Sequence, residues 1–90
     1  MNQVNEQLRK SCEEAMVAFQ KLNDKKYSDI QSKLEWCIGS YGYDKNPSGL
    51  REYGVQSLDL LKKVKSREPR KVNKKVIDAL EKALVNFSKN

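Results

Sequence analysis

The chain has 90 residues, of which 38% are hydrophobic and 33% charged, and it carries a formal net charge of +6 without a single histidine. A chain of this length fits one small domain and buries only about two-thirds of its unfolded surface, so we expect a single helical domain over residues 1–90 with a modest core. The composition is too apolar for wholesale disorder, and no apolar run approaches the roughly 18–20 residues that span a membrane. Residues 1–14, MNQVNEQLRKSCEE, also lack the apolar segment of a secretory signal. We therefore expect a cytoplasmic protein without a membrane partner.

Apolar residues in the first half recur at steps of three and four, which is the spacing of one buried helix face. This pattern predicts a first helix over residues 3–22 and a second over residues 25–40. Asp24 is the expected N-cap of the second helix, and Gly39 and Gly42 are expected to mark its end. The predicted buried residues are Val4, Leu8, Cys12, Ala15, Phe19 and Leu22 in the first helix, and Tyr27, Ile30, Leu34, Cys37 and Tyr41 in the second.

The second half predicts helices over residues 47–66 and 73–88, with Asn73 as the expected cap of the latter. Asn46 is the expected cap of the third helix and Pro47 its first turn, where the missing N–H of proline costs nothing. Gly54 lies on the apolar stripe of this helix, so either a neighbouring helix comes close there or the helix begins later. The predicted buried stripes are Leu50, Gly54, Ser57, Leu58, Leu61 and Val64, and then Val76, Ile77, Leu80, Ala83, Leu84 and Phe87.

Four amphipathic helices with short connections predict an all-α fold, a small up-and-down four-helix bundle. No segment shows the strict alternation of a half-buried strand. A helical dimer that completes its core through a partner is the main alternative.

Catalytic and metal-binding patterns are largely missing. General acid–base and nucleophilic catalysis most often use histidine, or a cysteine paired with it, so we expect no enzyme activity, no catalytic residues and no cofactor. Cys12 and Cys37 have no zinc-type spacing, and we expect them to be small buried side chains more readily than a disulfide.

The segment DKNPSG, residues 44–49, matches the start of a calcium-binding loop. The match fails because Val55 stands where the loop needs a bidentate glutamate, and Pro47 favours a helix start instead. We therefore expect no metal site.

Aromatic residues gather around the expected turn between the second and third helices. Tyr41 falls on the buried stripe and is expected in the core. Trp36, Tyr43 and Tyr53 are candidates for a partner-binding patch, because aromatic side chains with a polar tip suit half-buried surfaces; the alternative is that they close the end of the bundle.

The strongest functional signal is the charge of residues 62–75, KKVKSREPRKVNKK, which hold eight basic residues and one acid. Dense lysine and arginine attract polyanions, and Lys74 and Lys75 stand in a first helical turn, where the helix dipole favours acids. We expect a small non-enzymatic binding or interaction domain with a protein partner or self-association; the alternative is nonspecific nucleic-acid binding. The candidate contact residues are Lys62, Lys63, Lys65, Arg67, Arg70, Lys71, Lys74 and Lys75.

Overall fold

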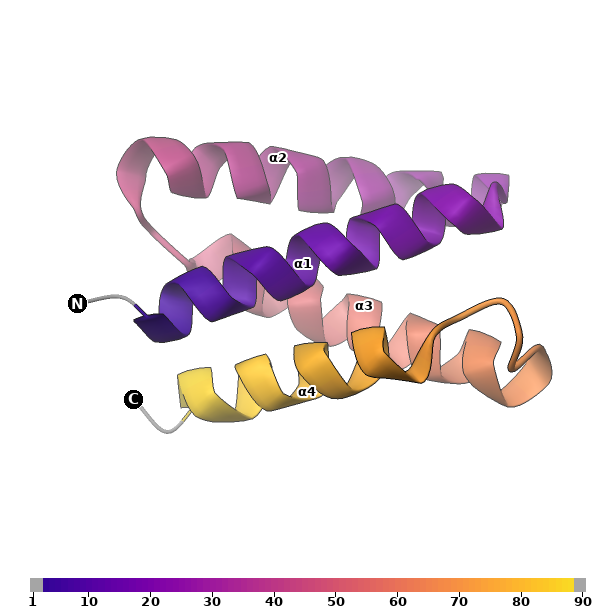
Figure 1. The fold of residues 1–90 in the computed structure, drawn as a ribbon. Helices are drawn as coiled ribbons and strands as arrows, with labels where there is room; N and C mark the ends of the chain where they lie inside the picture. The colour runs from indigo at the N-terminus through magenta and orange to yellow at the C-terminus, as the bar shows by residue number, and fades with distance from the viewer. Residues whose placement is uncertain (1–2, 89–90) are drawn as a thin grey trace.

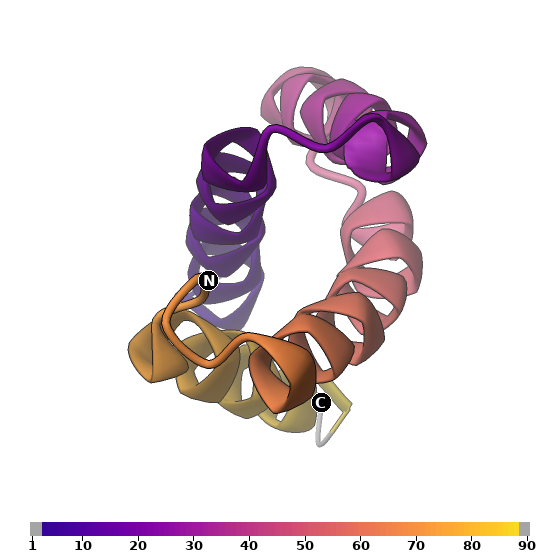
Figure 2. The same ribbon diagram turned by 90° about the vertical axis from the view of Figure 1, so that its right-hand side faces the viewer.

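Four α-helices make up almost all of the architecture. The computed structural model describes residues 3–88. The elements are α1 (Gln3–Leu22), a short 3-10 helix η1 (Lys25–Tyr27), α2 (Ser28–Asp44), α3 (Ser48–Arg67) and α4 (Lys74–Ser88). Successive helices run in opposite directions (Figure 1), and viewed along their length they form a ring in the order α1, α2, α3, α4 (Figure 2). The predicted all-α four-helix bundle is confirmed. Within the described range, no helix is both long and apolar enough to cross a membrane.

The end of the second helix differs from the prediction. Gly39 and Gly42 do not end it; α2 continues through both to Asp44, and neither glycine has a positive φ. The helix ends because Lys45 adopts a left-handed conformation with φ of 59° while its N–H donates to the carbonyl of Tyr41 at 2.8 Å. Glycine lowers helix propensity without forbidding helix, and the buried Tyr41 holds the last turns against the core.

Three side chains cap helix starts close to where the sequence predicts. The Asp24 carboxylate accepts the N–H of Lys26 at 3.1 Å, which places this cap on η1. The Asn46 carboxamide oxygen accepts the N–H of Ser48 at 3.1 Å, and the Asn73 oxygen accepts the N–H of Lys75 at 2.9 Å. Each cap satisfies an amide that the helix itself leaves unpaired, which fixes where the chain turns.

The core runs along the middle of the bundle and draws side chains from every helix. Full burial of one large aliphatic or aromatic side chain contributes roughly 1.5–3 kcal/mol, so each of the large buried residues matters to the stability of this small chain. The rings of Phe19 and Tyr27 pack with centroids 5.3 Å apart and fasten the first connection to the core. The largest fully buried side chains are Tyr41, Phe19, Leu8, Leu34, Leu50, Leu61, Leu80 and Val72.

Gly54 marks a close approach of helices in the centre of the bundle. An added Cβ would lie 3.3 Å from Leu84 Cδ2 and 3.5 Å from Cys12 Sγ. The first of the two interpretations of Gly54 is therefore correct, because α3 begins at Ser48 and the glycine lies inside it. Nearby, the buried hydroxyl of Ser57 donates to the carbonyl of Tyr53 at 2.7 Å, so this polar side chain enters the core without an unpaired donor.

Candidate functional site

The first and third connections of the bundle, which lie within the lysine-rich segments 21–26 and 62–75 or directly beside them, are at the same end of the bundle. The α1–α2 connection and the α3–α4 connection are both at the right-hand end in Figure 1 and face the viewer in Figure 2. A groove lined by Lys26, Tyr27, Lys63 and Arg67 joins the two connections. We call the basic residues of segments 21–26 and 62–75 at this end the basic pole.

The basic pole contains more charge than the sequence analysis assigned to it. Segments 21–26 and 62–75 together carry eleven basic and two acidic residues, whereas the rest of the chain carries seven basic and ten acidic residues. Lys21, Lys25 and Lys26 are the residues that sequence reasoning missed. The predicted up-and-down topology contained the signal, because the first and third connections of such a bundle lie at the same end.

Three of the candidate lysines at the pole form ion pairs with this chain. Lys62 pairs with Glu81 at 3.1 Å, Lys63 with Asp59 at 3.2 Å, and Lys71 with Glu68 at 3.4 Å. These pairs lie on the surface, where an ion pair contributes about 0–1 kcal/mol, so a competing anion can replace them at small cost.

Lys65 has a structural position. Its ammonium group donates to the carbonyl of Pro69 at 2.8 Å and to the carbonyl of Val72 at 3.0 Å. The Lys65 side chain therefore holds the connection between α3 and α4 in place by binding two of its backbone carbonyls. This uses two of its three N–H donors, and Lys65 is less available to a ligand than its neighbours.

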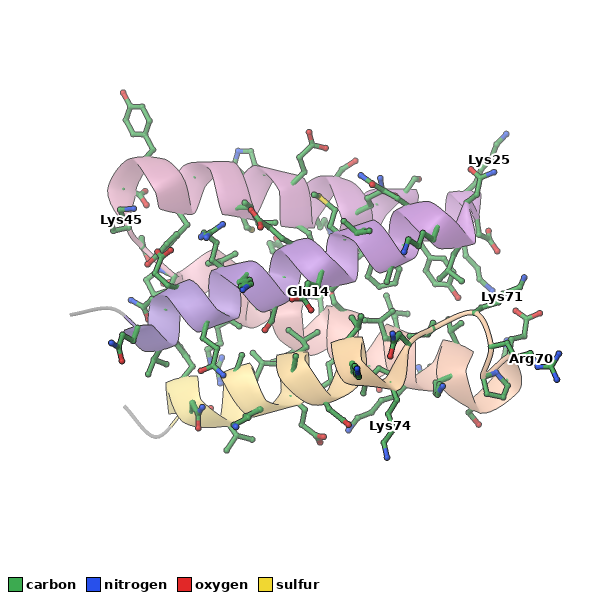
Figure 3. The ribbon with its side chains drawn as sticks, in the orientation of Figure 1. Glu14, Lys25, Lys45, Arg70, Lys71 and Lys74 are labelled. Carbon is green, nitrogen blue, oxygen red and sulfur yellow. The ribbon has the colours of Figure 1, made fainter. Side chains whose placement is uncertain are left out.

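The remaining basic residues of the pole have no ion pair with any described residue. Arg70, Lys71, Lys74 and Lys25 extend away from the bundle in Figure 3. Of these four, only Lys71 is paired. The basic residues of the pole whose charged groups form neither an ion pair nor a hydrogen bond with a described residue are Lys21, Lys25, Lys26, Arg67, Arg70, Lys74 and Lys75. Outside the pole, Lys10, Lys45, Arg51 and Lys82 also form none with a described residue, so the pole is distinguished by how many such residues it brings together.

A groove of about 870 Å³ lies beside the pole, between α1 and the connection that leads into α4. Lys21, Arg70 and Lys74 line it together with two apolar side chains, Val17 and Val76. Val17 is 42% exposed, so its side chain can be reached by another molecule in this groove. The wall formed by α1 also carries Glu13 and Glu14, so this groove combines apolar, basic and acidic groups.

The first turn of α4 carries two positive charges that are unfavourable for the helix dipole. Lys74 and Lys75 occupy the first turn and no acidic residue is present there. The Asn73 side chain already accepts the Lys75 N–H, so an anion at this corner would meet mainly side-chain ammonium groups.

The three aromatic candidates do not form one cluster. Trp36 is 69% exposed and Tyr43 is 96% exposed, both on the outer face of α2, where they line a common hollow. Tyr53 is half-buried on α3, packs against the core and has the Lys33 ammonium 5.5 Å from its ring centroid. Trp36 and Tyr43 therefore face outward, whereas Tyr53 belongs mainly to the packing.

Neither cysteine is placed for nucleophilic chemistry. Both are free and buried, as predicted, and burial raises the pKa of the Cys12 thiol to about 12. Burial also raises the pKa of Cys37. Both thiols are therefore protonated at neutral pH. Among the described residues, no three cysteine, aspartate or glutamate side chains come together as a set of metal ligands.

Comparison of the chain with protein-family models, with curated proteins and with solved structures gave no match.

Proposed function

We propose that the protein is a small non-enzymatic binding domain, cytoplasmic in location, and that its basic pole contacts an acidic partner protein. The observation that carries this proposal is the group of seven unpaired basic residues that two segments distant in sequence, 21–26 and 62–75, contribute to the basic pole. Like charges gathered at one place repel each other, and a bound anion would relieve this repulsion.

The groove beside the pole favours a protein partner over a nucleic acid. Val17 and Val76 offer an apolar surface that an aliphatic side chain of a partner protein can cover, whereas a phosphate backbone has no apolar group to place there. Protein interfaces commonly combine such a buried apolar centre with a charged rim. A partner segment that carries both acidic and aliphatic side chains fits these groups.

Nonspecific nucleic-acid binding is the second candidate. The density of unpaired basic residues supports it, because binding to phosphates requires only charge and depends steeply on salt. The pole offers no exposed aromatic side chain for base stacking, since Tyr27 is buried. Any such binding would therefore be independent of sequence.

A salt-titrated binding assay tests both candidates. The probes are a labelled peptide of alternating glutamate and leucine blocks, a random-sequence DNA duplex and a single-stranded RNA. The triple pole variant, Arg70→Ala with Lys71→Ala and Lys74→Ala, should weaken peptide binding by about tenfold, since each lost surface ion pair is worth up to about 1 kcal/mol. The matched control removes three exposed basic residues outside the pole, through Lys10→Ala, Arg51→Ala and Lys82→Ala, and should bind as the unmodified protein does.

The variant Val17→Ser separates the two candidates. It removes apolar contact from the groove without changing charge, so it should weaken binding of the peptide and leave binding of DNA and RNA unchanged. Affinity for all three probes that stays millimolar at low salt would contradict the proposal. Equal loss of binding in the triple pole variant and its control would also contradict it.

A further inference from the structure

The outer face of α2 is a second surface whose composition the fold does not explain. Trp36 and Tyr43 stand two helical turns apart, about 10.5 Å along the axis, with Gly39 between them. The hollow between the two rings is bordered by Glu35 and Asp44. We call this surface the aromatic face.

Packing within the chain gives no reason for the glycines of this helix. A Cβ added at Gly39 or Gly42 would meet nothing within 4 Å. Each glycine nevertheless costs about 1 kcal/mol relative to alanine in a helix interior. Because Gly39 has no side chain, the hollow between the two exposed rings stays open. Another molecule that bound between the rings would need this space.

The charge of the aromatic face favours a basic occupant. In the described range, α2 is the one helix with more acidic than basic residues, three against one. Its lysine, Lys33, is already paired with Asp29 at 3.1 Å. Glu35 and Asp44 form no ion pair with a described residue and stand beside the two rings. An arginine or lysine could therefore lie over a ring and approach a carboxylate at the same time.

We propose that the occupant is the basic pole of a second copy of the chain, so that copies associate head to tail. This proposal rests on the function proposed for the basic pole, and it identifies the aromatic face of a second copy as one acidic surface that the pole contacts. The pole projects outward, with Arg70 and Lys71 extending from the connection between α3 and α4 (Figure 3), and it offers the unpaired basic groups that the aromatic face lacks. Because the two surfaces are different, a dimer keeps the pole of one copy and the aromatic face of the other free, and assembly continues beyond a dimer.

Sedimentation velocity with two complementary variants tests this arrangement. The face variant carries Trp36→Ala and Glu35→Lys, and the pole variant carries Arg70→Glu and Lys71→Glu. All four side chains are exposed, and circular dichroism confirms that each variant is folded. The unmodified protein should form species larger than a dimer across the micromolar range at low salt. Each variant alone should be a monomer, and an equal mixture should form a dimer and nothing larger, since each copy then keeps one working surface.

The outcomes separate this proposal from the proposed function. A monomeric unmodified protein, or a mixture that stays monomeric, overturns head-to-tail association. A pole variant that assembles like the unmodified protein overturns it as well, because the aromatic faces would then contact each other. The same pole variant, tested with the glutamate–leucine peptide, reports on the proposed function alone: retained peptide binding contradicts that function, whatever the assembly state.

Discussion

The middle of the bundle and its basic pole follow different rules. In the middle, residues such as Gly54, Leu61 and Leu80 have a contact within the chain that explains their size. At the pole, Arg70 and Lys74 have no ion pair with any described residue and extend into solvent. The difference separates residues that the fold requires from residues that it merely tolerates. Contacts within the folded chain explain the composition of the middle but not that of the pole, and the proposed binding role addresses this difference.

The largest effect on stability should come from the middle. Leu80 is fully buried, so Leu80→Ala should lower the free energy of unfolding by about 2–5 kcal/mol through lost contacts and a cavity. Urea unfolding followed by circular dichroism measures this. A loss below about 1 kcal/mol would mean that the centre of the bundle is loosely packed, which would contradict the contrast between a tightly packed middle and an unpacked pole.

Gly49→Ala should be the next most damaging change. The added Cβ would lie 2.7 Å from the Sγ of buried Cys37, closer than van der Waals contact allows. Overpacking of this kind costs about 1–3 kcal/mol. The double variant with Cys37→Ala removes the obstructing sulfur and should recover part of the loss; no recovery would contradict the contact.

Gly42→Ala and Gly39→Ala should both stabilise the protein, by about 1 kcal/mol each, because alanine favours helix and meets no atom at either position. The two variants should differ in their effect on self-association. Gly39→Ala partly fills the hollow and should weaken self-association in sedimentation velocity, whereas Gly42→Ala lies outside the hollow and should leave it unchanged. Destabilisation by either substitution would show a packing role that the fold does not account for.

The triple pole variant should have the smallest effect on stability. Arg70, Lys71 and Lys74 are exposed, so their removal should change the free energy of unfolding by no more than about 0.5 kcal/mol. The same variant should bind the acidic peptide about tenfold more weakly, and urea unfolding together with the binding assay measures both properties. A large loss of stability would show that the pole is part of the fold after all.

Periodicity and capping residues predicted most of the fold. The stripe from Val4 to Leu22 and the caps at Asn46 and Asn73 depend on local physics, and the structure confirms the four helices that they define. The predicted end of α2 was wrong because a glycine weakens a helix by an amount that tertiary contacts can outweigh. Here the contact is made by Tyr41, which is buried in the core.

The candidate site was only partly predictable. Segment 62–75 is visible as a run of charge, but the addition of Lys21, Lys25 and Lys26 depends on which ends of the helices meet. The structural role of Lys65 depends on the path of a connection that no local pattern specifies. The separation of exposed Trp36 and Tyr43 from half-buried Tyr53 depends on how α2 and α3 rotate against the core.

The most direct test of the central claim is a nuclear magnetic resonance titration of the ¹⁵N-labelled protein with the glutamate–leucine peptide. The account predicts that amide shifts concentrate in segments 21–26 and 62–75 and along the groove at Val17 and Val76. Shifts confined to the opposite end of the bundle, around Asp44 and the start of α1, would contradict the assignment of the basic pole as the contact surface.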